Sequence, residues 1–386
     1  MRKSILFLLY FLFATLLVVN IWVFASGRTY LYKAIQTTYF KGKSGPSIDE
    51  YAIFESRIVK AENPKPWNFS DDFNTKTIPA EIEKKMIEME TVSFLVIQND
   101  SIKFEKYYKD WNTESISNSF SMAKTILSVL TGIAIKEGKI KDVNQKVSDF
   151  IPEFRNDERK NVSIKDLLTM SSGIGFFEDY VNPLAYPAEA YYGNDLKKLT
   201  LAYPQEVEPG TRFSYLSGDS QLLAFVLEAA TGKKVSDYAS EKLWSKINAE
   251  SDALWNLDDK DGNEKAFCCF ISKARDFARI GKLYQQKGNW SGEQIVDTNY
   301  VNESIEPCLI KDTEGNICDY YGYKWWLNDY KGFKIFYMRG IKGQYVINIP
   351  EKNIIIVRLG YKRPAEKHNN APEDFYWAID AALSMY

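Results

Sequence analysis

Ser121 and Lys124 lie three residues apart at the start of an apolar segment, a spacing that suits a nucleophile and its base. On a helix, side chains three residues apart share one face. Lys124 is the only charged residue between Met122 and Ile135, so the segment predicts a helix buried on several sides. Complete burial lowers the pKa of a lysine by as much as about 3–5 units. The neutral amine would take the serine proton, and the helix N-terminus would stabilise an oxyanion.

The Ser-x-x-Lys spacing also has a structural explanation. About two such matches are expected by chance at this serine and lysine content, and a lysine near a helix end can extend its amine to solvent. Ser121–Lys124 is nevertheless the only match in the chain. The apolar context therefore favours the catalytic interpretation.

Several other chemistries are disfavoured by composition. The single histidine, His368, lies in the polar run EKHNNAPED and is expected at the surface, which disfavours a Ser–His–Asp triad and zinc hydrolysis. The net charge of −2 comes with scattered basic residues, so no nucleic-acid surface is expected. No metal or organic cofactor is implied. The four cysteines, Cys268, Cys269, Cys308 and Cys318, have no C-x-x-C spacing, and both disulfides and buried free thiols are compatible with them.

The N-terminus predicts export or anchoring. Residues 4–26, SILFLLYFLFATLLVVNIWVFAS, carry no charge. This apolar stretch is longer than the core of a typical signal peptide and long enough to span a membrane. Val23 and Ala25 also suit a cleavage site, so a cleaved signal stays open as the alternative to a single-pass anchor. In both cases the remaining chain is expected to work outside the cytoplasm, for example in a periplasm.

The order of predicted elements indicates an α+β fold. Helical periodicity is expected at 80–90, 119–138, 163–173, 217–232, 273–288 and 372–386, and β-rich runs at 93–98, 101–108, 333–338, 343–349 and 353–360. Terminal strands would thus form one antiparallel sheet flanked by helices, beside a mostly helical region at about 140–300. We divide the chain into an anchor or signal peptide (1–26), a linker or stalk (27–77) and a hydrolase domain (78–386).

Several blocks in order resemble the penicillin-recognising serine enzymes, whose nucleophile motif is S-x-x-K. The likeness is to the class C β-lactamase-related branch, which includes carboxylesterases, D-aminopeptidases and 6-aminohexanoate-oligomer hydrolases. It covers about residues 90 to 362. The matching blocks include FSMAKTILSVLTGIAIKEGKI, VSIKDLLTMSSGI, EPGTRFSYLSGDSQLLAFVLEAATGK, KARDFARIGKLYQQKGNWSGEQIV, YGYKWW and RGIKGQYVINIPEKNIIIVRLG.

The resemblance implies a role for each matching residue. Ser121 would be acylated, with Lys124 as its base or proton relay. Tyr215 matches the tyrosine of the family's Y-x-N motif and would pass a proton to the leaving group, provided that nearby cations lower its pKa. The backbone N–H groups of Ser121 and Ile341 would form the oxyanion hole.

Two departures from the family pattern concern the substrate side. Ser217 stands where the motif has asparagine, and the third box reads Arg339–Gly340–Ile341–Lys342–Gly343 in place of K-T-G. Arg339 or Lys342 could replace the missing lysine that faces a substrate carboxylate, or either could be a solvated strand charge. Two aromatic residues, Trp326 and Tyr192, are further candidate cleft contacts, although tryptophans near a strand are more often in the core.

These features favour a serine hydrolase that cleaves a small-molecule amide or ester through an acyl-serine. One alternative is a non-catalytic member of the same fold that binds peptidoglycan fragments or another ligand, as the altered third box suggests. The other is a true β-lactamase or D-Ala peptidase. The substrate itself depends on scattered pocket residues and does not follow from the sequence.

Overall fold

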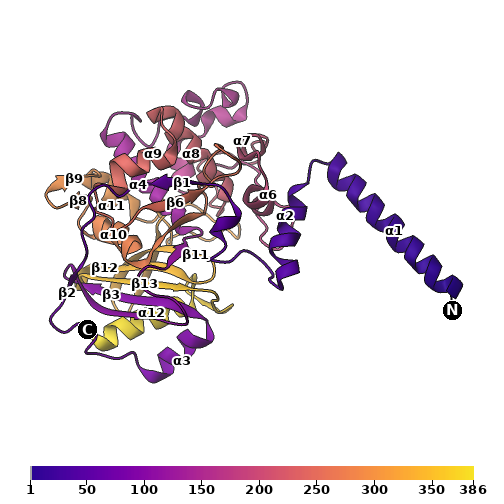
Figure 1. Ribbon diagram of the computed structural model, residues 1–386. Coiled ribbons are helices and arrows are strands. Elements are labelled where there is room, and N and C mark those ends of the chain that lie inside the picture. Colours follow the sequence, from indigo (N-terminus) through magenta and orange to yellow (C-terminus); the bar gives the residue numbers. More distant parts are fainter. Residues whose placement is uncertain (1) are drawn as a thin grey trace.

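A seven-stranded sheet crosses the folded body of the computed structural model, which describes residues 2–386 (Figure 1). Neighbouring strands are antiparallel except for β2 and β4, which are parallel. In spatial order the strands are β10 (Trp326–Tyr330), β11 (Phe333–Gly340), β12 (Gln344–Ile349), β13 (Ile354–Gly360), β3 (Thr91–Gln98), β4 (Ser101–Tyr107) and β2 (Asn68–Phe69). The predicted α+β fold with a sheet built from N- and C-terminal strands is therefore confirmed.

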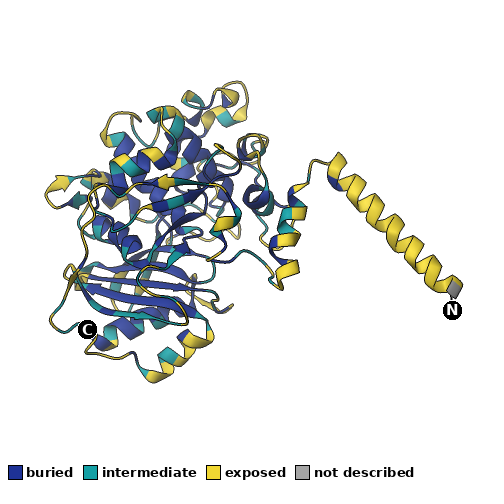
Figure 2. Cartoon of the chain, in the orientation of Figure 1, coloured by how far each residue is buried: buried dark blue, intermediate teal, exposed yellow. Residues whose placement is uncertain are grey.

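Both faces of this sheet are covered by helices, so its central strands are apolar throughout. Along β13, Ile354 and Ile356 pack on one face, whereas Ile355 and Val357 pack on the other. This follows from the period of two residues in a strand. Helices α3 (Ala80–Glu88) and α12 (Glu373–Met385) cover the first face, and α10 (Ala274–Gln285) covers the second (Figures 1 and 2).

A smaller four-stranded sheet lies in the other half of the body, among most of the remaining helices. Its spatial order is β1 (Ser56–Val59), β6 (Ala253–Asn256), β7 (Phe270–Lys273) and β5 (Ile116–Asn118). Strands β6 and β7 fall inside the stretch expected to be mostly helical. The helices are α4 (Met122–Lys136), α5 (Ile164–Leu168), α6 (Tyr186–Tyr192), α7 (Leu196–Leu201), α8 (Ser217–Thr231), α9 (Val235–Ala239) and α11 (Thr298–Ser304). Two short hairpins, β8–β9 (Asn289–Trp290, Glu293–Gln294) and β14–β15 (Lys367–His368, Ala371–Pro372), complete the strands.

Local sequence signals account for several element ends. Asn99 and Asp100 both have positive φ and join β3 to β4 in a two-residue turn. Ser163 and Asp166 form the predicted capping box at the start of α5. Gly232 ends α8 in the left-handed region, where glycine has no steric penalty.

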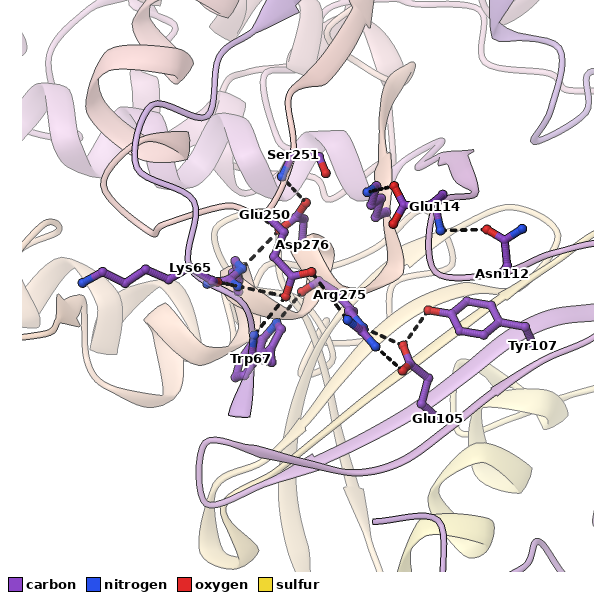
Figure 3. Close-up of polar contacts among 12 residues, drawn as sticks. Lys65, Trp67, Glu105, Tyr107, Asn112, Glu114, Glu250, Ser251, Arg275 and Asp276 are labelled. Carbon is purple, nitrogen blue, oxygen red and sulfur yellow. Dashed lines mark hydrogen bonds and ion pairs between the residues drawn. The ribbon is translucent and has the colours of Figure 1, made fainter. Parts of the chain in front are cut away.

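Residues 27–77, expected as a linker or stalk, lie against the folded body. They include helix α2 (Tyr30–Thr37) and the one-turn helix η1 (Tyr39–Lys41), and their strands β1 and β2 pair with β6 and β4. Figure 3 shows how the stretch around Trp67 is held: the Trp67 N–H donates to Glu250, which faces Arg275. Arg275 in turn donates to Glu105 on β4, with an Nε–Oε1 distance of 2.7 Å. Backbone pairing and this ionic network therefore hold residues 27–77 against the folded body.

Helix α1 (Arg2–Ala25) extends away from the body and is exposed along almost its whole length (Figures 1 and 2). It is long and apolar enough to cross a membrane, and it is the one helix of that kind among residues 2–386. A signal peptide has the same properties.

The four cysteines fall into two kinds. Cys268 and Cys269, adjacent in the chain, form a disulfide, so the free-thiol alternative is wrong for this pair. Cys308 and Cys318 are free thiols, with the Cys308 sulfur 3.7 Å from the Cys318 carbonyl oxygen.

Candidate active site

The candidate nucleophile lies at the turn that leads from β5 into α4. Phe120, the residue before Ser121, has a φ of +44°, a conformation that costs a non-glycine residue about 1–3 kcal/mol. Its N–H donates to the Asn118 side-chain oxygen at 2.9 Å, which supports the turn. Ser121 then occupies the N-cap position of α4, with no side-chain capping bond. The hydroxyl is therefore free to face the cleft at the positive end of the helix.

Lys124 reaches Ser121 from inside the body. Its Nζ lies 3.2 Å from the Ser121 Oγ, 3.4 Å from the Ser217 Oγ and 2.7 Å from the Phe267 carbonyl oxygen. The residue is only 1% exposed. Burial lowers the pKa of Lys124 to about 8, and the negative charge of Glu178 opposes part of this shift. The amine is therefore partly neutral near neutral pH.

Tyr215 lies close to both Ser121 and Lys124. Its ring centroid is 5.3 Å from the Lys124 Nζ, and its ring packs at 5.2 Å against Trp326. Burial raises the pKa of Tyr215 to about 12, although a hydrogen bond with Ser121 and the charge of Arg339 pull it the other way. The neighbouring cations Arg339 and Arg363 do lower this pKa, but in the resting site desolvation outweighs them. The phenol keeps its proton and is available as a proton donor.

A carboxylate, Glu178, is connected to the lysine through Ser217. The Glu178 Oε1 accepts a hydrogen bond from the Ser217 Oγ at 2.5 Å, and its Oε2 accepts one from the Ser217 N–H at 2.8 Å. Since the Ser217 hydroxyl also faces Lys124, serine at this position links the amine to the carboxylate. No sequence pattern pointed to Glu178, which lies in an irregular loop.

The end of β11 supplies a second backbone edge close to the nucleophile. Gly340 approaches so closely that a Cβ there would lie 2.4 Å from the Ser119 carbonyl oxygen, so only glycine fits. Ile341 follows at the cleft wall. Among the backbone hydrogen bonds of residues 2–386, the N–H groups of Ser121 and Ile341 have no acceptor. Both residues line the same cleft, so each places an unpaired N–H group in its wall region.

These groups open into one cleft with a volume of about 640 Å³. The predicted site residues that line it are Ser121, Tyr192, Tyr215, Ser217, Trp326, Arg339, Ile341 and Lys342. Trp326 faces the cleft, whereas its neighbour Trp325 is fully buried in the core. Every candidate residue named from the sequence thus reaches this region, with Lys124 just beneath the wall.

The cleft also has walls that the sequence analysis missed. Part of one wall comes from residues 34–46, in the segment expected as a linker, and another part from residues 180–188. Tyr180 belongs to the second part, and its hydroxyl donates to Glu178 at 2.7 Å. Arg363 and Lys367, after β13, add two cations. These residues lie in loops and short helices, which carry too little periodicity for their position to be inferred.

The arrangement supplies what acyl transfer requires: a hydroxyl, a buried amine of lowered pKa, a protonated phenol and two free N–H donors. No group of three or more His, Cys, Asp or Glu side chains suited to a metal ion occurs in the described part of the chain.

Comparisons with known proteins agree on the family and the fold of this chain. The family model described as Beta-lactamase matches residues 80–377. The 6-aminohexanoate-dimer hydrolase of Paenarthrobacter ureafaciens is 25% identical over 309 residues, which are 75% of this chain and 77% of that protein. A proposed 6-aminohexanoate-dimer hydrolase from Bacillus anthracis superimposes with a TM-score of 0.74 at 20% identity, covering 88% of this chain and 92% of that one. A family VIII carboxylesterase gives a TM-score of 0.62 at 19% identity, with 81% and 99% coverage.

Proposed function

Because the chain belongs to the beta-lactamase family, we propose that it is a serine hydrolase that cleaves an amide or ester through an acyl intermediate on Ser121. One observation carries the proposal: the buried Lys124 amine, with its pKa lowered to about 8, lies 3.2 Å from the Ser121 hydroxyl. A buried amine with such a pKa is a suitable general base at neutral pH.

In the first half-reaction, the neutral Lys124 amine takes the Ser121 proton as Oγ bonds to the substrate carbonyl carbon. The oxyanion that forms is stabilised by the N–H groups of Ser121 and Ile341. When the tetrahedral intermediate collapses, the carbon–nitrogen or carbon–oxygen bond breaks, and Tyr215 protonates the leaving group. The proton held by Lys124 then returns to Tyr215, which restores both groups.

In the second half-reaction, water replaces the leaving group. The neutral Lys124 amine, through Tyr215, takes a proton from water as the water oxygen bonds to the acyl carbon. Collapse of the second intermediate breaks the bond to Ser121, and Lys124 returns its proton to the Ser121 Oγ. Glu178 acts here as a positioning residue, since it holds Ser217 beside Lys124.

The relatives support amides and esters as the substrate class. The Paenarthrobacter relative is named for hydrolysis of a 6-aminohexanoate dimer, and a similar solved structure is a carboxylesterase. The proposal extends only this shared bond class to the present chain. The acyl and leaving groups of its own substrate depend on the cleft walls.

We further propose that residues 1–26 hold the hydrolase domain, residues 78–386, at the outer side of a cell membrane. The support is helix α1, whose span Lys3–Ala25 has the length and apolar character of a single membrane crossing. Protease protection of an uncleaved chain in vesicles would test the anchor. A mature protein that begins near residue 26 would show a cleaved signal instead.

A fluorophosphonate probe tests the catalytic proposal, because it phosphonylates an activated serine. The full chain in nanodiscs should be labelled at Ser121, the Ser121→Ala variant should not, and Ser128→Ala, from the same helix, should be labelled like the wild type. Turnover of p-nitrophenyl acetate should follow the same order. Equal labelling of the wild type and Ser121→Ala would refute the proposal, and ligand binding without turnover would favour a non-catalytic role.

A further inference from the structure

Exposed apolar side chains concentrate at the mouth of the catalytic cleft. Outside α1, thirteen large apolar side chains are exposed among the residues described, and eight of them lie on residues 32–40 and 177–184. Phe40 is 82% exposed and Val181 is 91% exposed. Three of the eight, Tyr39, Tyr180 and Val181, line the cleft, and the other five lie on the same two segments beside them. We call these eight side chains the apolar rim. A patch of this kind on a soluble surface marks a site that contacts another molecule or a membrane.

The rim adjoins the apolar helix α1. Only residues 26–29 separate α1 from α2, and the Tyr32 hydroxyl on α2 donates to the Asn20 side chain on α1 at 2.5 Å. The Tyr30 hydroxyl donates to the Pro183 carbonyl at 3.0 Å, which joins the two halves of the rim. In Figure 1, α1, α2 and α6 lie on the same side of the molecule. If α1 spans a bilayer, the cleft entrance lies within a few residues of the bilayer surface.

The cleft wall carries positive charge without negative charge. Its cations are Arg339, Lys342, Arg363 and Lys367, and no aspartate or glutamate is among the residues that line it. The Arg339 guanidinium stacks on Trp326 at 4.2 Å. The other three cations make no ion pair within residues 2–386. A substrate group placed against Lys342, Arg363 and Lys367 would meet cations that form no ion pair, whereas the Glu178 carboxylate lies beside Ser217 and Tyr180 at another part of the wall.

We propose that the substrate is an anionic amphiphile that enters the cleft from the membrane surface. This inference rests on the proposed hydrolase function and specifies its substrate class. The anionic group faces the Lys342, Arg363 and Lys367 side of the cleft. The acyl chain lies along the apolar rim, and the carbonyl group between the acyl chain and the anionic group reaches Ser121. The bilayer is the source because the same rim that would hold the chain adjoins the anchor helix.

Turnover of matched esters tests whether the cleft recognises the anionic group. Dodecanoyl esters of 4-hydroxybenzoate and of neutral 4-hydroxybenzamide are embedded in phosphatidylglycerol vesicles with the full chain. The wild type should prefer the anionic ester. Arg363→Gln should lower the ratio of kcat/KM for the anionic ester to that for the neutral ester about fivefold. Lys334→Gln, a charge-matched control at the exposed far end of β11, should not lower it.

The rim is tested with the same dodecanoyl esters and their acetyl counterparts. The double variant Phe40→Ser/Val181→Ser should lower the dodecanoyl-to-acetyl rate ratio at least about tenfold, since both side chains would otherwise be buried against the chain. Ile87→Ser, which removes an exposed side chain from α3 on the far side of the sheet, should leave the ratio unchanged. The inference is overturned if the anionic and neutral esters are hydrolysed equally, or if the rim variants leave the dodecanoyl-to-acetyl rate ratio unchanged.

A binding measurement separates failure of the inference from failure of the hydrolase proposal. Ser121→Ala in phosphatidylcholine nanodiscs is titrated with octylphosphonate and with octyltrimethylammonium, with empty nanodiscs as the blank. The phosphonate should bind at least about fivefold more tightly, and Arg363→Gln should reduce the difference. Selective binding by a chain that hydrolyses no ester would refute the proposed function and support the ligand class. Equal binding would overturn the ligand class even in an active hydrolase.

Discussion

The Lys124 amine and the Ser121 hydroxyl lie 3.2 Å apart on the first turn of α4, and protein closes over the amine from behind. The Lys124 Nζ also donates a hydrogen bond to the Phe267 carbonyl oxygen at 2.7 Å, which helps to hold the amine in place. A base held in this way does not need a histidine. Its protonation state is set by desolvation, which makes the chemistry sensitive to pH and to any charge placed nearby.

Acylation of Ser121 should therefore accelerate as the pH rises through about 8. Lys124 acts as a base only when neutral, and a pKa of about 8 makes it about one tenth neutral at pH 7 and about nine tenths neutral at pH 9. The second-order rate of fluorophosphonate labelling between pH 6 and 9.5 measures this. Lys265→Met removes another buried lysine, outside the cleft wall, and should keep the same midpoint. A rate independent of pH would contradict Lys124 as the base.

Lys124→Met should abolish most of the labelling while the chain stays folded. Methionine retains an unbranched chain of similar length but cannot accept a proton, and loss of a general base typically costs about 10²–10⁴-fold in rate. Labelling rates at pH 9 and circular dichroism of the same samples measure the two effects. A folded Lys124→Met variant that reacts at the wild-type rate would exclude the amine from the mechanism.

Glu178→Gln should shift the pH profile to lower pH and slow the reaction. The negative charge of Glu178 raises the pKa of Lys124 against the effect of burial, so its removal lets that pKa fall further. The neutral amide of the variant would also hold Ser217 less firmly, since an uncharged acceptor forms a weaker hydrogen bond. Asp179→Asn is the matched control, because Asp179 caps the next turn at Val181 N–H and has no part in the lysine's pKa shift. An unchanged midpoint in Glu178→Gln would refute the electrostatic link.

Tyr215→Phe should impair amides more than activated esters. In the proposed mechanism the phenol protonates the leaving group. An amine requires that proton, whereas p-nitrophenolate leaves without it. We expect a loss of about 10²–10⁴-fold for an anilide and a smaller loss for the p-nitrophenyl ester. Tyr321→Phe is the control, since that buried ring packs edge-on against Tyr215 at 5.9 Å but does not line the cleft. Equal losses for both substrates would mean that the hydroxyl serves packing or binding.

The sequence allows prediction of those parts of the fold and site that are set by local residue patterns. Ser121 and Lys124 were identified because one helical turn brings them together, and β3 and β13 because long β-rich runs favour strands. Strands β6 and β7 were missed, since four residues between irregular loops show no clear period.

The remaining parts depend on tertiary contacts that no local pattern encodes. The hydrogen bonds that link Glu178 to Lys124 pass through Ser217, which follows Glu178 by 39 residues in the chain. Residues 27–77 are rich in turn-forming and charged residues, which is typical of a linker, yet β1 pairs with β6 across almost 200 residues. The raised pKa of Tyr215 has the same origin, because desolvation is set by the packing of Trp326 and Tyr321 around it.

The ionic network that holds the N-terminal segment should contribute to stability without taking part in catalysis. Arg275 is 14% exposed, pairs with the buried Glu105 carboxylate and faces Glu250, which accepts from Trp67 (Figure 3). Arg275→Ala leaves the Glu105 carboxylate without its cation, whereas Glu250 keeps its pair with Arg279. The loss of one partner from a buried pair costs about 3–5 kcal/mol in the free energy of unfolding.

The matched control is Lys273→Ala, two residues away. Lys273 pairs with Glu114, whose side chain is 78% exposed, so this loss should cost at most about 1 kcal/mol. Urea unfolding of both variants in nanodiscs, followed by tryptophan fluorescence, measures the difference. Ser121 labelling per folded molecule should stay at the wild-type level in both, because neither Arg275 nor Lys273 lines the cleft. Equal destabilisation by the two variants would show that Arg275 acts only as a surface charge.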